Sequence, residues 1–370
     1  MTRLILASFA AAGLGVVIQT LTRASVGDLE TQATLAWNAG DTDAAEILAR
    51  RALVRDPQSQ RAQEVLQQLT LHSPQPALVV ALEVLRTDEQ SPVDQALRNG
   101  ETALGQDLLR VAEAFWEEGL ERDPNQAVLR ARLVTLAGIR LDPQTMLTQL
   151  LEMPDKEDLH SNLVLLCLSG FAVDTHGAFP TEVQLRWSLE ADSRDVKTRL
   201  ALARALMLLG RHQECRQILE VIPDNESAAT LMAVLCSING QPEAAEFLPA
   251  QPPRGYEADY FRAAALIRAR NGDEDGAISA WRNAVLAKPL SSSLRAQFCD
   301  ALRNSGNTTE LRREAAALDQ VREIAEVASS EDTVLTPGTL NRLQALCEAV
   351  GADDATRLLA RVQPDLEHSE

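Results

Sequence analysis

The stretch Gly272–Pro289, GDEDGAISAWRNAVLAKP, contains the pattern that decides the fold of this 370-residue chain. Alanines stand five and twelve residues after its opening glycine, a tryptophan stands nine residues after it, and a proline closes the stretch. A glycine readily adopts the left-handed conformation that ends a helix, and small residues seven apart allow two helices to approach closely. Proline then stops the second helix. The stretch therefore predicts the turn and the second helix of a helix–turn–helix unit.

The same frame recurs along the chain. It is present in Gly40–Pro57 (GDTDAAEILARRALVRDP) and in Asp107–Pro124, where an aspartate replaces the opening glycine. Further glycines, Gly210, Gly240, Gly272 and Gly306, follow one another at intervals of 30, 32 and 34 residues. A helix–turn–helix unit of about 34 residues is typical of tetratricopeptide repeats. The chain resembles the tetratricopeptide repeat (TPR) family in these segments.

The resemblance implies an all-α, TPR-like α-solenoid that forms a right-handed superhelix. The composition also favours helices, because 55 alanines and 56 leucines accompany only seven Phe, four Trp and two Tyr. Residues 25–370 have room for about ten antiparallel helix pairs of this length. We expect helices at 28–39 with 42–55, 59–71 with 75–88, 91–105 with 107–122, 125–139 with 143–152, 158–170 with 180–191, 196–209 with 212–221, 226–238 with 241–248, 256–271 with 274–287, 291–305 with 308–327, and 338–349 with 353–362.

The chain also predicts a division into segments. Residues 249–255 (PAQPPRG) contain two adjacent prolines that cannot be helical, so we expect a hinge between a first solenoid segment, 25–248, and a second, 256–370. Residues 1–24 differ from the rest, because Arg3 precedes an apolar run, Leu4 to Ile18, with no acidic residue before Asp28. This pattern predicts a signal peptide, with cleavage after residue 24, or an uncleaved membrane anchor over residues 4–21. Both alternatives export residues 25–370 to the periplasm or the extracytoplasmic face of a membrane.

Charge and motifs exclude several classes of function. With 35 Lys and Arg against 53 Asp and Glu, the net charge of −18 argues against nucleic-acid binding. Five histidines and five cysteines lack metal-ligand spacing, and phosphate-binding loops and nucleophile elbows are missing from the sequence. The cysteines stand in helical runs, two of them at positions where the family has a small residue, so we expect all five to fill the core. We expect no enzyme, cofactor, metal site or small-molecule substrate.

The remaining function is the binding of another protein. The concave face of a solenoid binds peptides or helices, and in this family the first helices line it at fixed distances before the closing glycine. That frame gives these candidate partner-binding residues: Trp37, Asn38, Lys197, Arg204, Arg262 and Arg303. Two alternatives are open for the arginines, a basic strip in the groove or pairing with neighbouring acids, and Trp37 is either a groove anchor or a core residue. We expect a scaffold that binds another cell-envelope protein. The alternative is a permanently bound accessory subunit of a membrane-associated enzyme complex.

Overall fold

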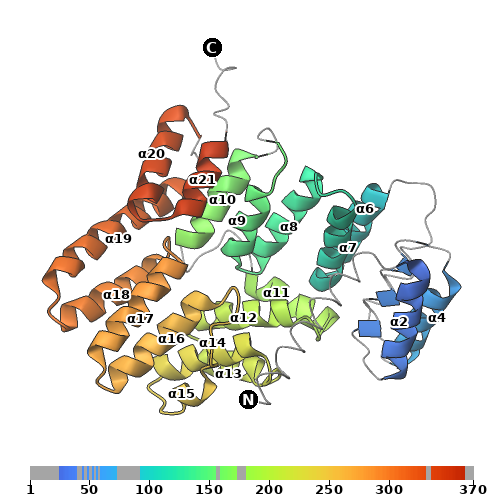
Figure 1. Ribbon diagram of the computed structural model, residues 1–370, viewed down its shortest axis with the longest axis horizontal. Coiled ribbons are helices and arrows are strands. Elements are labelled where there is room, and N and C mark those ends of the chain that lie inside the picture. Colours follow the sequence, from blue (N-terminus) through green and yellow to red (C-terminus); the bar gives the residue numbers. More distant parts are fainter. Residues whose placement is uncertain are drawn as a thin grey trace, which may run out of the picture. The chain divides into compact units, whose positions relative to one another are not determined.

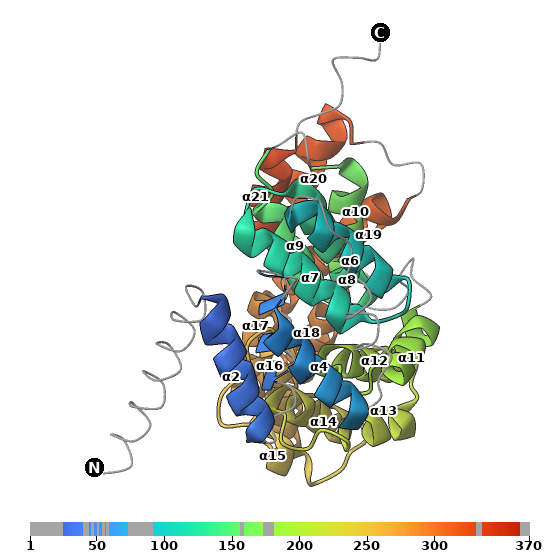
Figure 2. The same cartoon turned by 90° about the vertical axis from the view of Figure 1, so that its right-hand side faces the viewer.

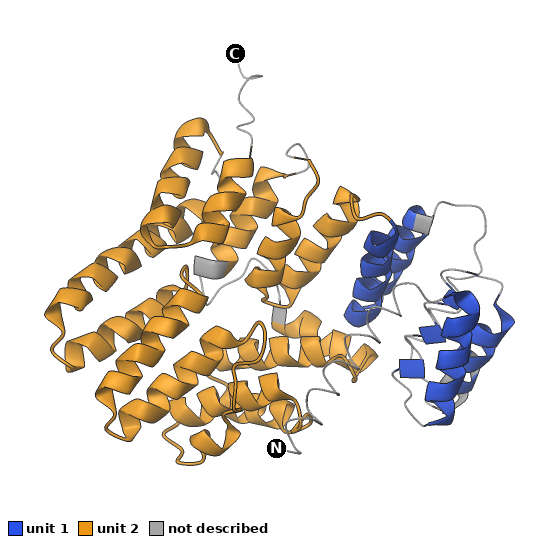
Figure 3. Cartoon of the chain, in the orientation of Figure 1, with its two compact units in different colours: residues 1–122 blue, residues 123–370 orange. Residues whose placement is uncertain are grey.

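The computed structural model divides the chain into two compact units, Met1–Arg122 and Asp123–Glu370 (Figure 3). It describes residues 25–39, 59–72, 92–155, 159–172, 181–330 and 335–362, together with a few positions between 44 and 56. The predicted leader or anchor at 1–24 lies outside these residues, as do most of the predicted helices 42–55 and 75–88. Among the described helices, none is both long and apolar enough to cross a bilayer.

The described residues form an all-α repeat protein of eighteen helices, confirming the predicted fold class (Figure 1). Unit 1 contains α2 (Val26–Asn38), α4 (Gln60–His72), α6 (Pro92–Leu104) and α7 (Leu109–Arg122). Unit 2 contains α8 (Ala127–Ile139), α9 (Pro143–Leu151), α10 (Ser161–Ala172), α11 (Thr181–Ala191), α12 (Val196–Leu208), α13 (His212–Leu219), α14 (Glu226–Ile238), α15 (Ala244–Phe247), α16 (Glu257–Arg270), α17 (Glu274–Ala287), α18 (Ser292–Asn304), α19 (Thr308–Ser329), α20 (Pro337–Ala349) and α21 (Asp353–Arg361). Most consecutive helices pack as pairs, as the frame predicts: α6 with α7, α8 with α9, α12 with α13, α14 with α15, α16 with α17, α18 with α19, and α20 with α21.

The turn inside each of these pairs has one recurring form. One residue shortly after the first helix is left-handed, as at Gly272, which lies two positions beyond the end of α16 and has a φ of +79°. The next amide bonds back across the turn, as Asp273 N does to Arg268 O at 3.0 Å. This hydrogen bond satisfies a carbonyl that the helix end would otherwise leave unpaired. Asp107, with φ of 59°, takes the glycine's place in the α6–α7 turn. The prediction that these residues end the first helices is therefore confirmed.

Polar side chains begin many of the helices. Asp273 precedes α17 and its carboxylate accepts from Gly276 N at 2.9 Å, while Asn225 does the same for α14 through Ala228 N at 3.0 Å. Such caps satisfy one of the free amides at a helix start. The sequence GDEDG at 272–276 is thus a turn followed by a helix start, as predicted.

An arginine at the fourth position of three first helices holds the turn that precedes its own helix. Arg130 of α8, Arg199 of α12 and Arg295 of α18 each donate to the carbonyl of the residue six positions earlier, in the turn before the helix. The acceptors are Pro124, Ser193 and Pro289. All three arginines are buried, so a charged group inside the protein holds each of these turns. In two of the three cases the acceptor is the proline that closes the preceding stretch, a spacing that the repeat frame did not include.

Unit 2 is closed by its own C-terminal helices. In both views α21 lies beside α9 and α10, and α10 packs on α19 (Figures 1 and 2). One core cluster combines residues from 134 to 168 with residues from 321 to 362. Arg361 at the end of α21 donates to the carbonyls of Leu151 and Met153 at the end of α9. Residues about 200 positions apart in sequence therefore share one core.

Two elements differ from the expected sequence of pairs. The helices predicted at 158–170 and 180–191 are present as α10 and α11, but α10 packs mainly on α19 and α9, and α11 packs on α12. The predicted pairing of these two helices is wrong because the main partner of α10 is α19, which comes from the C-terminal part of the chain and which no local pattern reveals. The unit boundary falls at residues 122 and 123, and the Pro-rich residues 249–255 lie inside unit 2, where α14 and α16 are in contact. The motion of a hinge at 249–255 and the right-handed superhelix stay predictions.

Candidate functional site

The predicted partner-binding residues are distributed over both units. Trp37 and Asn38 belong to α2 of unit 1, whereas the four basic residues belong to first helices of unit 2. Lys197 and Arg204 lie on α12, Arg262 on α16 and Arg303 on α18. Because α14 contacts both α12 and α16, the two helices that carry Arg204 and Arg262 are neighbours on either side of α14 (Figure 1).

Arg204 reaches across from α12 to the beginning of α16. Its Nη2 atom lies 2.7 Å from Oδ2 of Asp259 and 3.5 Å from the carbonyl oxygen of Gly255. Its guanidinium carbon lies 4.1 Å from the centre of the Tyr256 ring, within the range of a cation–π contact. We call Arg204, Tyr256 and Asp259 the Arg204 cluster.

The row of polar contacts continues along α16 to α18. Arg262, one helical turn after Asp259, donates from Nε to Oε1 of Gln297 on α18 at 3.1 Å. Side chains of three first helices, α12, α16 and α18, are thus connected in series. Arg204 and Arg262 are two of the residues that the repeat frame selects for the groove. Asp259, thirteen residues before Gly272, also stands at a groove position of the frame, although it is not among the predicted partner-binding residues.

A buried ion pair lies next to the Arg204 cluster. Arg140 at the end of α8 contacts Oδ2 of Asp195 at 2.8 Å and donates to Oγ1 of Thr198 at 3.2 Å. Both charged side chains are buried, and burial of charges is unfavourable. The Thr198 hydroxyl offsets part of this cost, because it accepts from Arg140 and donates to Asp195. Arg140 and Asp142 both interact electrostatically with Tyr256.

The surroundings change the titration of two members of the cluster. Burial lowers the pKa of Arg204, but the charge and the hydrogen bond of Asp259 outweigh it, and the net pKa is raised. Burial is the main reason that the pKa of Tyr256 is raised above its ordinary value. At neutral pH Arg204 therefore remains charged, and the Tyr256 hydroxyl keeps the proton with which it can donate a hydrogen bond.

The other predicted residues have different surroundings. Arg303 is 63% exposed and pairs with Asp300 on its own helix, and Lys197 is exposed at the start of α12. Asn38 is exposed, whereas Trp37 is partly buried against the cluster that contains Leu29 and Ala33. The structure thus brings Arg204 and Arg262 into one polar row and gives Arg303 an acidic partner outside it. A partner-binding role of all six residues stays a prediction.

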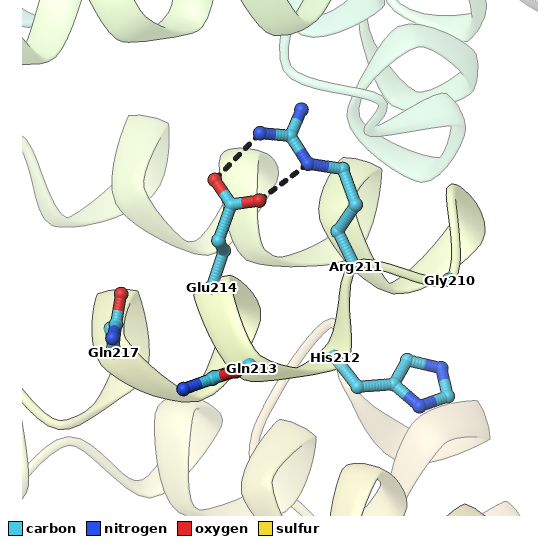
Figure 4. A pocket seen from close by; sticks show the side chains of 6 residues that line it. All are labelled: Gly210, Arg211, His212, Gln213, Glu214 and Gln217. Carbon is cyan, nitrogen blue, oxygen red and sulfur yellow. Dashed lines mark hydrogen bonds and ion pairs between the residues drawn. The ribbon is translucent and has the colours of Figure 1, made fainter.

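A surface depression lies at the turn between α12 and α13 (Figure 4). It is lined by Gly210, Arg211, His212, Gln213, Glu214 and Gln217. Arg211 binds both carboxylate oxygens of Glu214 at 2.6 Å, and this hydrogen bond lowers the pKa of Glu214. Arg186 and Glu182 complete an exposed network of two cations and two anions. Because its charges compensate one another at the surface, we do not regard this depression as the site.

Metal ligands and nucleophiles are the other groups of the described part of the chain that bear on function. It contains no set of three or more His, Cys, Asp and Glu side chains arranged for a metal ion. His212 instead contacts Asn239, with 2.6 Å between Nδ1 and Oδ1. All five cysteines are buried free thiols, which confirms their predicted role in the core. Burial raises the pKa of Cys215 and of Cys347 to about 12, so these thiols are poor nucleophiles at neutral pH.

Comparisons with known proteins add little to this description. No family model matches the chain, and no curated protein matches its sequence. Among solved structures, the chain is similar to one in the crystal structure of the APC/C hetero-tetramer Cut9-Hcn1, with 13% sequence identity and a TM-score of 0.35. The alignment covers 92% of this chain and 74% of that chain. A similarity at this TM-score carries no inference about function.

Proposed function

We propose that the chain is a non-catalytic scaffold that binds another protein along the first helices of unit 2. The observation that supports it best is the polar row on α12, α16 and α18, in which Arg204 contacts Asp259 and Arg262 contacts Gln297. Arg204, Asp259 and Arg262 come from positions that line the binding face of similar repeats. Paired helices with side chains on one face of successive units provide an extended surface for a peptide or a helix.

Site-specific photocrosslinking in the native host tests this proposal. A photoreactive phenylalanine analogue at Lys197 should form an adduct with one partner protein. The same analogue at Leu286, which is 71% exposed on the second helix α17, is the matched control. The adduct should be lost when Arg204→Ala is added. Equal adducts from both positions, or none from Lys197, would contradict the proposed binding face.

The assembly state distinguishes the scaffold from an accessory subunit. A scaffold that exchanges partners should elute from a sizing column both alone and in complexes at its native level. A single stoichiometric assembly would support the alternative of a permanently bound subunit. Stoichiometry by native mass spectrometry decides between these two roles.

We further propose that residues 1–24 export the chain and that the partner belongs to the cell envelope. The support is the sequence pattern of Arg3 followed by the apolar run Leu4 to Ile18. The intact mass of the protein from its native host should lack residues 1–24 if they are a signal peptide. An intact chain in the membrane fraction would support the anchor over residues 4–21, and an intact chain outside the membrane fraction would contradict both forms.

A further inference from the structure

The Arg204 cluster keeps hydrogen-bonding groups that the protein itself does not use. Arg204 donates only through Nη2, and Asp259 accepts only through Oδ2. Within the part of the chain that the structure describes, Nε and Nη1 of Arg204, Oδ1 of Asp259 and the hydroxyl of Tyr256 have no hydrogen-bond partner. The side chains of Arg204 and Asp259 are 22% and 24% exposed, so a ligand can reach them. The cluster therefore presents donors and an acceptor together.

The charges around the cluster decide which ligand fits. Asp259 already compensates Arg204, and Asp142 interacts electrostatically with the same guanidinium. The neighbouring Arg140 is compensated by Asp195. With Arg262, one helical turn after Asp259, three guanidinium groups thus stand beside three carboxylates. A carboxylate ligand would add a fourth anion close to Asp259, and a cation would meet three guanidinium groups, so both charged classes are disfavoured.

A neutral amide matches the unused groups without adding charge. Its carbonyl oxygen can accept from the free edge of Arg204, and its N–H can donate to Oδ1 of Asp259. The guanidinium is held in place by the Tyr256 ring and by Asp259, so little freedom remains to be lost on binding. Amide groups are planar, as is the guanidinium that would bind them.

We infer that the Arg204 cluster binds an uncharged amide of the partner protein, in place of an acidic tail or a basic side chain. This inference rests on the proposed function, since it names the chemistry recognised by the same face. The amide comes either from an Asn or Gln side chain or from the main chain.

Selection from a displayed library of random peptides on the full-length protein tests the inference. Peptides that bind wild type should bind Arg204→Met at least about tenfold more weakly, because both unused donors are lost. The matched control is Arg282→Met. This arginine is exposed on α17, outside the Arg204 cluster, and its guanidinium lies 2.9 Å from the carboxylate of Glu310. That control should leave binding unchanged.

The charge of the ligand is then varied on a selected peptide. Replacing its critical Gln or Asn by Glu or Asp should weaken binding to wild type at least about tenfold. In Asp259→Asn the compensating anion is gone, so this difference should disappear or reverse. If replacing each Asn and Gln by Ala leaves binding intact while N-methylation of one backbone amide abolishes it, the recognised amide is in the main chain.

Three results would overturn the inference. The first is that wild type prefers the Glu or Asp peptide, and the second is that Arg204-dependent peptides owe their binding to Lys or Arg. Either result would leave the proposed binding face intact. The third is that no selected peptide depends on Arg204. The proposed function is then judged separately by the crosslinks from Lys197. The binding of the neutral and the acidic peptide to the wild-type protein can be compared without any variant. This comparison therefore tests the inference even if Arg204→Met fails to fold.

Discussion

Single residues control how closely the paired helices approach. In unit 1, Trp116 of α7 is fully buried and lies directly against Gly100 of α6, whose missing side chain makes room for the indole. The Nε1 atom of Trp116 is 3.5 Å from the carbonyl oxygen of Leu97. The frame correctly marked Trp116 as a large residue of the second helix. Its partner Gly100 could not be recognised, because a glycine inside a helix has no distinctive spacing.

Gly100→Ala should therefore destabilise the α6–α7 pair. An ideal Cβ at Gly100 would lie 2.1 Å from Nε1 of Trp116, so the indole must move, at a cost of about 2 kcal/mol. Gly105→Ala is the control, since its Cβ would meet no neighbouring atom closer than 3.5 Å. Hydrogen exchange over α6 and α7 measures the effect. Equal protection in the two variants would contradict the steric argument.

Cys347 gives a pH dependence at the residue scale. In the unfolded chain its thiol ionises near the ordinary pKa of 9.0, but burial raises the pKa in the folded chain to about 12. The unfolded state therefore loses its proton first, and the free energy of unfolding falls as the pH rises from about 9 towards 12. Each such thiol contributes at most about 1.4 kcal/mol per pH unit. The free energy of unfolding is measured by urea unfolding at several pH values between 9 and 12. Cys347→Ala should make it fall less steeply with pH, and an unchanged pH dependence would contradict the prediction.

At the scale of helices, the junctions between pairs depend on buried arginines. Arg295 of α18 donates to the carbonyl oxygen of Val350 at 2.8 Å and pairs with Glu314 of α19 at 2.7 Å, and both charged side chains are buried. It therefore joins α18, α19 and the end of α20. The repeat frame located these helices, but it could not show that a charged residue lies in their interior.

Arg295→Met should remove the buried partner of Glu314, which then keeps only the pair with the exposed Arg313, and should leave the carbonyls of Pro289 and Val350 without this donor. The expected cost in unfolding free energy is about 3 kcal/mol or more. The double variant Arg295→Met with Glu314→Leu should recover most of this loss. Arg303→Met is the control, because its pair with Asp300 is exposed and should contribute less than about 1 kcal/mol. Urea unfolding measures all three variants. Similar losses for Arg295→Met and Arg303→Met would refute the role of Arg295.

At the scale of the whole molecule, each unit has its own organisation. Unit 2 differs from an open row of pairs, because α19, α20 and α21 share a core with α9 and α10. The Arg204 cluster lies within this unit, between α12 and α16. Its existence depends on the packing of α12, α14 and α16, which brings residues 55 positions apart into hydrogen-bonding distance.

Arg361→Ala should open the closure of unit 2. Without the guanidinium, the carbonyls of Leu151 and Met153 lose their donor, at a cost of about 1–3 kcal/mol. Hydrogen exchange should show lower protection in α9 and α21, with no change in α16 and α17. Arg357→Ala is the matched control, since Arg357 pairs with Asp354 on its own helix. A uniform loss of protection throughout unit 2 would contradict a local closure.

The amino-acid sequence by itself determined the local structure. Glycines and an aspartate at turns, alanines seven apart and closing prolines predicted most described helices to within a few residues, because helix starts, ends and close contacts depend on neighbours in sequence. The same frame selected Arg204 and Arg262 as candidates, and their role in binding stays a prediction. Only the tertiary structure decided which helices meet, namely that α10 packs on α19 and that Arg204 pairs with Asp259. Such contacts depend on the curvature of the whole stack of helices, which adds up from the packing angle between each helix and the next. No local sequence pattern encodes that curvature.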